Sequence, residues 1–111
     1  MKVKRLGVWA LTAVLGIEFC VAGLAKFVPS SAWPRMFLQW GFPPWVRPVI
    51  GVTEVVCGVA LFVPRARRPA CAVLLCIMAG AAVTHLVHGE LGRLLLPVAL
   101  AVMLGLLGAA D

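Results

Sequence analysis

The chain has 111 residues, enough for one domain, and 63% of them are hydrophobic while only 13% are charged. A soluble domain usually carries about 25% charged residues, so this composition excludes a small water-soluble protein and indicates an integral membrane protein. The net charge is +6, but the basic residues are split among short segments, which argues against a nucleic-acid partner. We expect a single membrane domain over residues 1–111 that is surrounded by the lipid bilayer.

An apolar run over residues 6–27 follows the basic residues Lys2, Lys4 and Arg5. As a helix it would be about 33 Å long, enough to cross a hydrocarbon core of ~30 Å. A basic start followed by an apolar run is also typical of a secretory signal, but no A-x-A cleavage site is apparent. We therefore predict a retained first transmembrane helix over residues 6–27.

The segment that follows is rich in proline and aromatic residues. Trp33, Phe37 and Trp40 recur at i, i+4 and i+7, which would place three rings on one face of a short helix. Aromatic faces of this kind are typical of helices in the headgroup layer. We predict an interfacial helix over residues 31–41, with Trp45 as a further anchor; a quinone contact is the alternative use of such a stripe.

Three more apolar segments, at residues 44–63, 69–88 and 94–110, are predicted to be transmembrane helices. Prolines bound them, and the basic sequence PRARRP at residues 64–69 is expected to form a tight turn. Because every connection is short, neighbouring helices should be antiparallel. The predicted fold is an all-α, antiparallel four-transmembrane-helix bundle with a short interfacial helix between helices 1 and 2.

The distribution of basic residues predicts the orientation of this bundle. With four spans, one side of the membrane would hold Lys2, Lys4, Arg5, Arg65, Arg67 and Arg68, and the other Lys26, Arg35, Arg47 and Arg93. The first group is larger and lies in short flanking segments, where the positive-inside rule is strongest. We expect both termini in the cytoplasm and the aromatic loop outside.

One carboxylate, Glu54, interrupts the apolar run at residues 50–63. A charged acid at the centre of a membrane helix costs about 2.5 to 3.5 kcal/mol, and such residues are functional candidates by default. Gly51 and Gly58 share a helical face with Glu54, which would let a neighbouring helix approach closely. A structural ion pair or a hydrogen bond to the backbone is the alternative role for Glu54.

The other polar residues at membrane depth lie in the same outer half as Glu54. From the outer boundary, Glu18 would be ~13 Å and Glu54 ~10 Å deep. We predict an outward-facing polar pocket between helices 1–3, in which Lys26 and His85 reach Glu54. The candidates for the ligand pocket or a proton relay are Glu54, Lys26, His85, Glu18, Thr84 and His88. The alternatives are that Lys26 snorkels to the interface and that His88 is an exposed residue at the start of a loop.

The four cysteines, Cys20, Cys57, Cys71 and Cys76, all lie in apolar segments without a CxxC pair. No Cys/His spacing resembles a zinc site, so we predict packing roles for them. His85 and His88 with Glu18 and Glu54 could form a di-metal site in a four-helix core, but the usual ExxH pairs are missing. We predict no metal site.

Three segments together resemble the DoxX family, and in particular its DoxX-like subfamily: AGLAKF at residues 22–27, GVTEVVCG at residues 51–58 and AAVTHLVHGE at residues 81–90. The resemblance implies a small four-helix protein of the bacterial cytoplasmic membrane that is linked to redox processes. Relatives include quinone-reducing thiosulfate oxidoreductase subunits and a complex that works with a superoxide dismutase and a sulfurtransferase. A eukaryotic branch that resembles this fold assists assembly of acetylcholine receptors. The cysteine pairs of some redox members are absent here, which argues against direct thiol chemistry.

These observations favour a membrane subunit of a redox-associated module that binds a quinone-like or other small apolar ligand. Glu54 would accept or relay a proton, Lys26 would hold its charge state, and His85 would hydrogen-bond a ligand oxygen. The alternatives are a non-enzymatic assembly or chaperone factor and a small transport component. The sequence leaves open whether the protein is an enzyme, whether a quinone is its cofactor, whether it has a membrane or peripheral redox partner, and whether it forms a homo-oligomer.

Overall fold

The computed structural model describes residues 2–110, and over this range the chain contains helices and turns but no strand. Its elements are α1 (Lys2–Ala25), α2 (Trp33–Gln39), α3 (Val46–Ala60), α4 (Pro64–Val87), the 3-10 helix η1 (Leu91–Arg93) and α5 (Leu95–Ala110). The molecule is elongated, with extents of 47 × 25 × 20 Å. The prediction of an all-helical chain is confirmed over the described residues.

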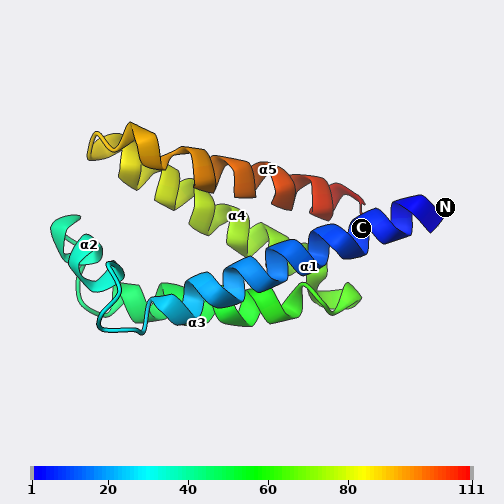
Figure 1. Ribbon diagram of the computed structural model, residues 1–111, viewed down its shortest axis with the longest axis horizontal. Helices are drawn as coiled ribbons and strands as arrows, with labels where there is room; N and C mark the ends of the chain where they lie inside the picture. Colours follow the sequence, from blue (N-terminus) through cyan, green and yellow to red (C-terminus); the bar gives the residue numbers. More distant parts are fainter. Residues whose placement is uncertain (1, 111) are drawn as a thin grey trace.

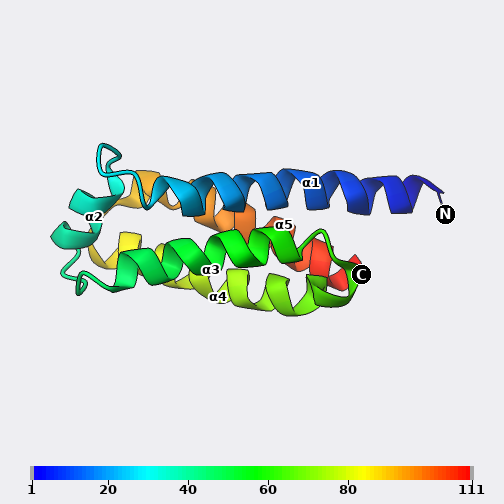
Figure 2. The same cartoon turned by 90° about the horizontal axis from the view of Figure 1, so that it is seen from below.

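The long helices form two antiparallel pairs. Helices α1 and α3 lie side by side in one pair, and α4 and α5 form the other (Figures 1 and 2). The two pairs approach each other at the end that holds the chain termini and diverge toward α2 (Figure 1). We call these the closed end and the open end of the bundle.

The closed end is filled by a hydrophobic core to which both pairs contribute. Its completely buried side chains are those of Leu15, Leu61, Leu74, Leu104 and Leu107. No comparable cluster of apolar side chains lies between the pairs at the open end, within the described part of the chain. The core therefore joins the two pairs at one end and leaves space between them at the other.

Two pairs of glycines bring the backbones of α1 and α3 into direct contact. A Cβ atom added to Gly23 would lie 2.6 Å from the Gly51 carbonyl oxygen, and one added to Gly51 would lie 2.9 Å from the Gly23 oxygen. Gly16 and Gly58 form a second reciprocal pair, seven residues earlier in α1 and seven residues later in α3. Helix association in lipid depends on close packing, and small residues permit it. The expectation that Gly51 and Gly58 allow close approach is thus confirmed for α1.

Replacing Gly23 by alanine is expected to destabilise the bundle by about 1 to 3 kcal/mol, because the added methyl group forces the two backbones apart. Gly7→Ala in the same helix is the matched control, since a Cβ there has no heavy atom within 4 Å. The control should be neutral or slightly stabilising through helix propensity. Thermal unfolding in detergent, followed by circular dichroism, measures both; equal stability of the two variants would contradict the packing argument.

Three helical segments are long and apolar enough to cross a membrane: Val3–Ala25, Pro64–Val87 and Leu91–Ala110. The fourth predicted span, over residues 44–63, is shorter in the structure. Helix α3 has 15 residues, which corresponds to about 22 Å, less than a hydrocarbon core of ~30 Å. The protein is therefore an all-helical membrane protein with three candidate spans by length and composition.

The tight turn predicted at residues 64–69 is wrong, because α4 already begins at Pro64 and includes Pro69. A proline in the first helical turn costs no hydrogen bond, which suits Pro64 to that place. The Arg67 side chain is buried, and its Nε donates to the carbonyl oxygen of Leu61 at 2.9 Å. Its guanidinium also lies 4.8 Å from the centre of the Trp9 ring. These contacts hold the basic segment in the helix, and the turn lies at Leu61–Val63 instead.

Candidate functional site

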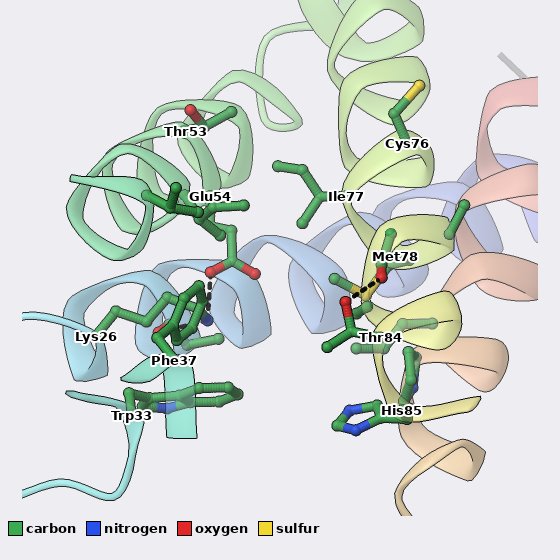
Figure 3. Close-up of a pocket in the computed structure, with 18 of the residues that line it drawn as sticks. Lys26, Trp33, Phe37, Thr53, Glu54, Cys76, Ile77, Met78, Thr84 and His85 are labelled. Carbon is green, nitrogen blue, oxygen red and sulfur yellow. Dashed lines mark hydrogen bonds and ion pairs between the residues drawn. The ribbon is translucent and has the colours of Figure 1, made fainter. Parts of the chain in front are cut away.

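A cavity of about 1000 Å³ occupies the space between the two helix pairs at the open end. All five α-helices contribute to its walls, which are mostly apolar. Four aromatic rings line it on the side of α2, those of Trp33, Phe37, Trp40 and Phe42. Figure 3 shows Glu54 and Lys26 on one wall, with Thr84 and His85 on the opposite wall. The cavity thus combines a large apolar volume with a small number of polar groups.

Glu54 and Lys26 form a buried ion pair in this cavity. The distance from Lys26 Nζ to Glu54 Oε1 is 2.5 Å, and the two side chains are 5% and 3% exposed. Gly23 precedes Lys26 by one helical turn and Gly51 precedes Glu54 by one turn, so the contact between these glycines sets the pair's separation. The predicted approach of Lys26 to Glu54 is confirmed, and a Lys26 that snorkels to the interface does not fit its burial.

Lys26 is also held by three other groups. Its Nζ lies 3.4 Å from the Ala22 carbonyl oxygen and 4.0 Å from the centre of the Trp33 ring, over which it stacks. An ammonium over an indole face is attracted by the ring's quadrupole. Arg47 donates a hydrogen bond to the Lys26 carbonyl oxygen and so fixes the end of α1 to the start of α3. The ammonium group is thereby surrounded on the side of α2 as well as on that of α3.

His85 is hydrogen-bonded to Glu90 and not to Glu54, so the prediction that it reaches Glu54 is wrong. Its Nδ1 lies 2.9 Å from Glu90 Oε1, while the divergence of the two helix pairs separates α4 from α3 at this end (Figure 1). The same oxygen accepts a hydrogen bond from Trp40 Nε1 at 3.0 Å. Arg93 Nη1 donates to the other carboxylate oxygen at 3.2 Å. We call Trp40, His85, Glu90 and Arg93 the outer latch, because it ties α2 to the end of α4 and to η1.

The outer latch alters the titration of Glu90, which lies in the connection between the spans. The hydrogen bond with His85 lowers the pKa of Glu90 below its ordinary value, and the Trp40 hydrogen bond and the charge of Arg93 act in the same direction. These effects outweigh the partial desolvation of the carboxylate, which acts to raise its pKa. The carboxylate therefore stays ionised and keeps accepting hydrogen bonds at neutral pH.

Among the other candidates, Glu18 and Thr84 line the cavity, but His88 does not. Glu18 lies two helical turns before Lys26 and is half-buried; within residues 2–110 it has no hydrogen bond or ion pair. The Thr84 hydroxyl donates to the Gly80 carbonyl oxygen at 2.8 Å. His88 is exposed and is hydrogen-bonded to the Thr84 carbonyl oxygen. This agrees with the alternative interpretation of His88 as an exposed residue at the start of a loop.

The predicted aromatic stripe is present but forms a cluster. Ring centres are 6.1 Å apart for Trp33 and Phe37 and 5.3 Å apart for Phe37 and Trp40. Phe42, which the spacing argument does not include, completes the cluster at 5.6 Å from Phe37. Trp45 is 64% exposed and stands apart from the cavity. Three of the four predicted anchors therefore line the cavity, and Trp45 does not.

The comparison with known families decides the identity of the chain. The model of the DoxX-like family matches residues 10–107. The chain belongs to the DoxX-like family. No curated protein matches it. The matched range contains the whole of α2, α3 and α4 and every side chain of the cavity and the outer latch, so the site of this DoxX-like protein lies within the family domain.

The histidine and cysteine side chains of this DoxX-like protein are dispersed over the described residues. Within residues 2–110, no three His, Cys, Asp or Glu side chains gather where they could hold a metal ion. His85 and His88 point to different partners, Glu90 and the Thr84 carbonyl. Within residues 2–110 none of the four cysteines forms a disulfide, and Cys57 and Cys71 are buried.

Proposed function

We propose that this DoxX-like protein is a membrane subunit of a redox-associated module and that it binds a quinone-like or other small apolar ligand in the cavity at the open end. The observation that carries the proposal is the cavity itself. Ligand sites are typically concave, mostly apolar spaces of about 300 to 1000 Å³ with a few placed polar groups. The volume of about 1000 Å³, the aromatic rings and the Glu54–Lys26 pair fit this description.

The proposed setting is the bacterial cytoplasmic membrane, with α3 as a fourth span, α2 in the outer headgroup layer and both termini in the cytoplasm. Helix α3 presents Val52, Val56 and Val59 outward, each more than half exposed, and this face suits lipid. The basic residues Lys4, Arg5, Arg65 and Arg68 lie toward the closed end, and the aromatic cluster lies at the open end. The positive-inside rule then favours a cytoplasmic closed end.

In this proposal Glu54 accepts or passes a proton and Lys26 sets its charge state. The carboxylate and the ammonium lie 2.5 Å apart as an ion pair, so a ligand that approaches the pair has a proton acceptor and a proton donor within reach in the cavity. His85 borders the ligand from the opposite wall and is held in place by Glu90. Proton movement beside a redox-active ligand is the chemistry that these three residues suit.

The proposal is tested by filling the cavity. Ala81 lines the cavity, and Ala82, its neighbour in α4, lines a groove along α4 and α5 instead. Ala81→Trp is expected to reduce the binding of decylubiquinone in lipid nanodiscs at least tenfold, because the indole would occupy ligand volume. Ala82→Trp should bind like the wild type. The retained ligand is measured by extraction and chromatography against empty nanodiscs, and equal binding by both variants would refute a ligand site in the cavity.

An assembly factor is the second candidate, favoured by exposed apolar side chains at the open end. Leu38 on α2 is 75% exposed and Trp45 is 64% exposed, and both lie outside the cavity lining. Such groups can contact a partner membrane protein. Loss of a co-purifying partner in Leu38→Glu, with its retention in Ala81→Trp, would favour this function over ligand binding.

A further inference from the structure

We infer that the cavity selects a ligand whose polar head donates hydrogen bonds, so that it binds a hydroquinone in preference to the corresponding quinone. The inference rests on the proposed function, because it requires that the cavity hold a ligand, and it adds the redox state of that ligand. It follows from which hydrogen-bonding groups of the cavity are already used and which are free.

The strongest donor in the cavity, the Lys26 ammonium, is fully engaged. An ammonium has three N–H donors. Glu54 Oε1 lies 2.5 Å from Nζ, the Ala22 carbonyl oxygen lies 3.4 Å away, and the Trp33 ring covers Nζ with its centre at 4.0 Å. A ligand carbonyl would have to displace one of these groups to reach Lys26.

The hydroxyl donors of the cavity are engaged as well. Thr53 Oγ1 donates to the Val49 carbonyl oxygen and Thr84 Oγ1 to the Gly80 carbonyl oxygen, each at 2.8 Å. Both bonds lie within a helical turn, so they persist as long as the helices do. The threonines line the cavity but direct their hydroxyl hydrogens to the backbone.

At the open end, the outer latch uses the Trp40 N–H and one N–H group of Arg93, whose side chain is 52% exposed and keeps its other N–H groups at the surface. Trp40 Nε1 and Arg93 Nη1 both donate to Glu90. In the aromatic cluster, the Trp33 indole N–H has no hydrogen-bond acceptor within residues 2–110. The Trp33 side chain is half-buried. Deeper in the cavity, the described side chains offer a ligand few free donors.

The free groups are acceptors on three sides of the cavity. Glu18 has no partner within residues 2–110, and Glu54 contacts Lys26 through Oε1 only, which leaves its Oε2 free. His85 directs Nδ1 to the Glu90 carboxylate and so donates through it; in the neutral imidazole this leaves Nε2 as an acceptor. The side chains of Glu54 and His85 are otherwise enclosed by protein, at 3% and 9% exposed.

A quinone and its hydroquinone differ in their hydrogen-bonding groups. The carbonyl oxygens of a quinone only accept hydrogen bonds, so beside these groups they would lose the bonds of water without replacement. The two hydroxyl groups of a hydroquinone donate, and each can bond a free carboxylate oxygen or imidazole nitrogen. We expect the hydroquinone to bind at least tenfold more tightly. A tenfold preference raises the midpoint potential of the bound two-electron couple by about 30 mV.

The test compares decylubiquinol with decylubiquinone, which differ by two hydrogen atoms. Each is titrated under anaerobic conditions into nanodiscs with the full-length protein, and binding is measured against empty nanodiscs. In Glu18→Gln the carboxamide supplies N–H donors, so the preference for the reduced form should fall about threefold or more. Thr53→Val is the matched control, because its hydroxyl already bonds the backbone; its preference should equal that of the wild type.

The outcomes separate this inference from the proposed function. A preference for decylubiquinol that falls in Glu18→Gln and persists in Thr53→Val supports the inference. Equal binding of both forms by the wild-type protein, or tighter binding of decylubiquinone, overturns it and leaves the ligand site in place. If neither form binds above the level of empty nanodiscs, the proposed function fails and this inference fails with it.

Discussion

Replacing Lys26 by methionine is expected to destabilise the protein by about 3 to 5 kcal/mol, the usual cost of leaving one partner of a buried ion pair alone. Glu54 would remain nearly enclosed, with no other cation bonded to it in the described chain. Methionine keeps most of the volume of lysine, so the loss reports mainly on charge. Unfolding by sodium dodecyl sulfate or by heat, in mild detergent, measures the change.

The double variant Lys26→Met/Glu54→Gln provides the control for this experiment. It removes both charges, and replacing both partners of a buried pair is often nearly neutral. We expect it to recover most of the stability that the single variant loses. A double variant as unstable as Lys26→Met would show that the packing of Lys26 against Trp33, and not its charge, stabilises this end of α1.

Acidification is expected to release the outer latch. Because the pKa of Glu90 is lower in the folded protein than in the unfolded chain, its contribution is complete above the unfolded value, about 4.3, and is lost as the pH falls through the folded value. The groups that face it are the His85 imidazole from α4 and the Arg93 guanidinium from η1. Protonation removes a charged acceptor from Trp40, so hydrogen–deuterium exchange in α2 should accelerate.

The matched variant for the latch is Glu90→Gln, which resembles the protonated acid at every pH. Its α2 should exchange faster than that of the wild type at neutral pH, because charge-assisted hydrogen bonds are about twice as strong as neutral ones. It should also lose the acid dependence below pH ~4.3. Wild-type protection of α2 that is independent of pH, or a variant with unchanged protection, would be inconsistent with a latch centred on Glu90.

The sequence was sufficient to predict the membrane class, and it indicated the Glu54–Lys26 contact as one of two alternatives for Lys26. A composition with 13% charged residues leaves little alternative to a membrane protein. The contact could be predicted because Gly51 and Glu54 share a helical face, and a glycine on that face admits the end of α1. Helical periodicity is enough to place Gly51 and Glu54 on the same face of α3.

The position of His85 could not be predicted in the same way. Its stripe with Thr84 on α4 does face the cavity, but periodicity does not specify the angle at which the α4–α5 pair leaves the α1–α3 pair. That angle places Glu90 and not Glu54 beside the imidazole. The role of Glu90 could not be predicted from local sequence patterns, because Glu90 lies in a loop and interacts with Trp40, fifty residues earlier in the chain.

The start of α4 shows a different limitation. Two prolines and three arginines in PRARRP favour a turn by composition. The helix forms there because Arg67 bonds the Leu61 carbonyl oxygen, directly after α3, and stacks on Trp9 of α1. Tertiary contacts of one buried side chain outweigh the local preference.

The side of the cavity formed by α3 and α4 determines which concentration of ligand governs its occupancy. Its lining includes Val49 and Val73, which are 52% and 41% exposed on the surfaces of α3 and α4. In a bilayer this flank would meet acyl chains, so a ligand would enter sideways from the leaflet in which it is dissolved. The quantity that determines occupancy is then the mole fraction of ligand in the lipid, not its concentration in water. Two ligands with equal contacts in the cavity would differ in apparent aqueous affinity by the ratio of their partition coefficients.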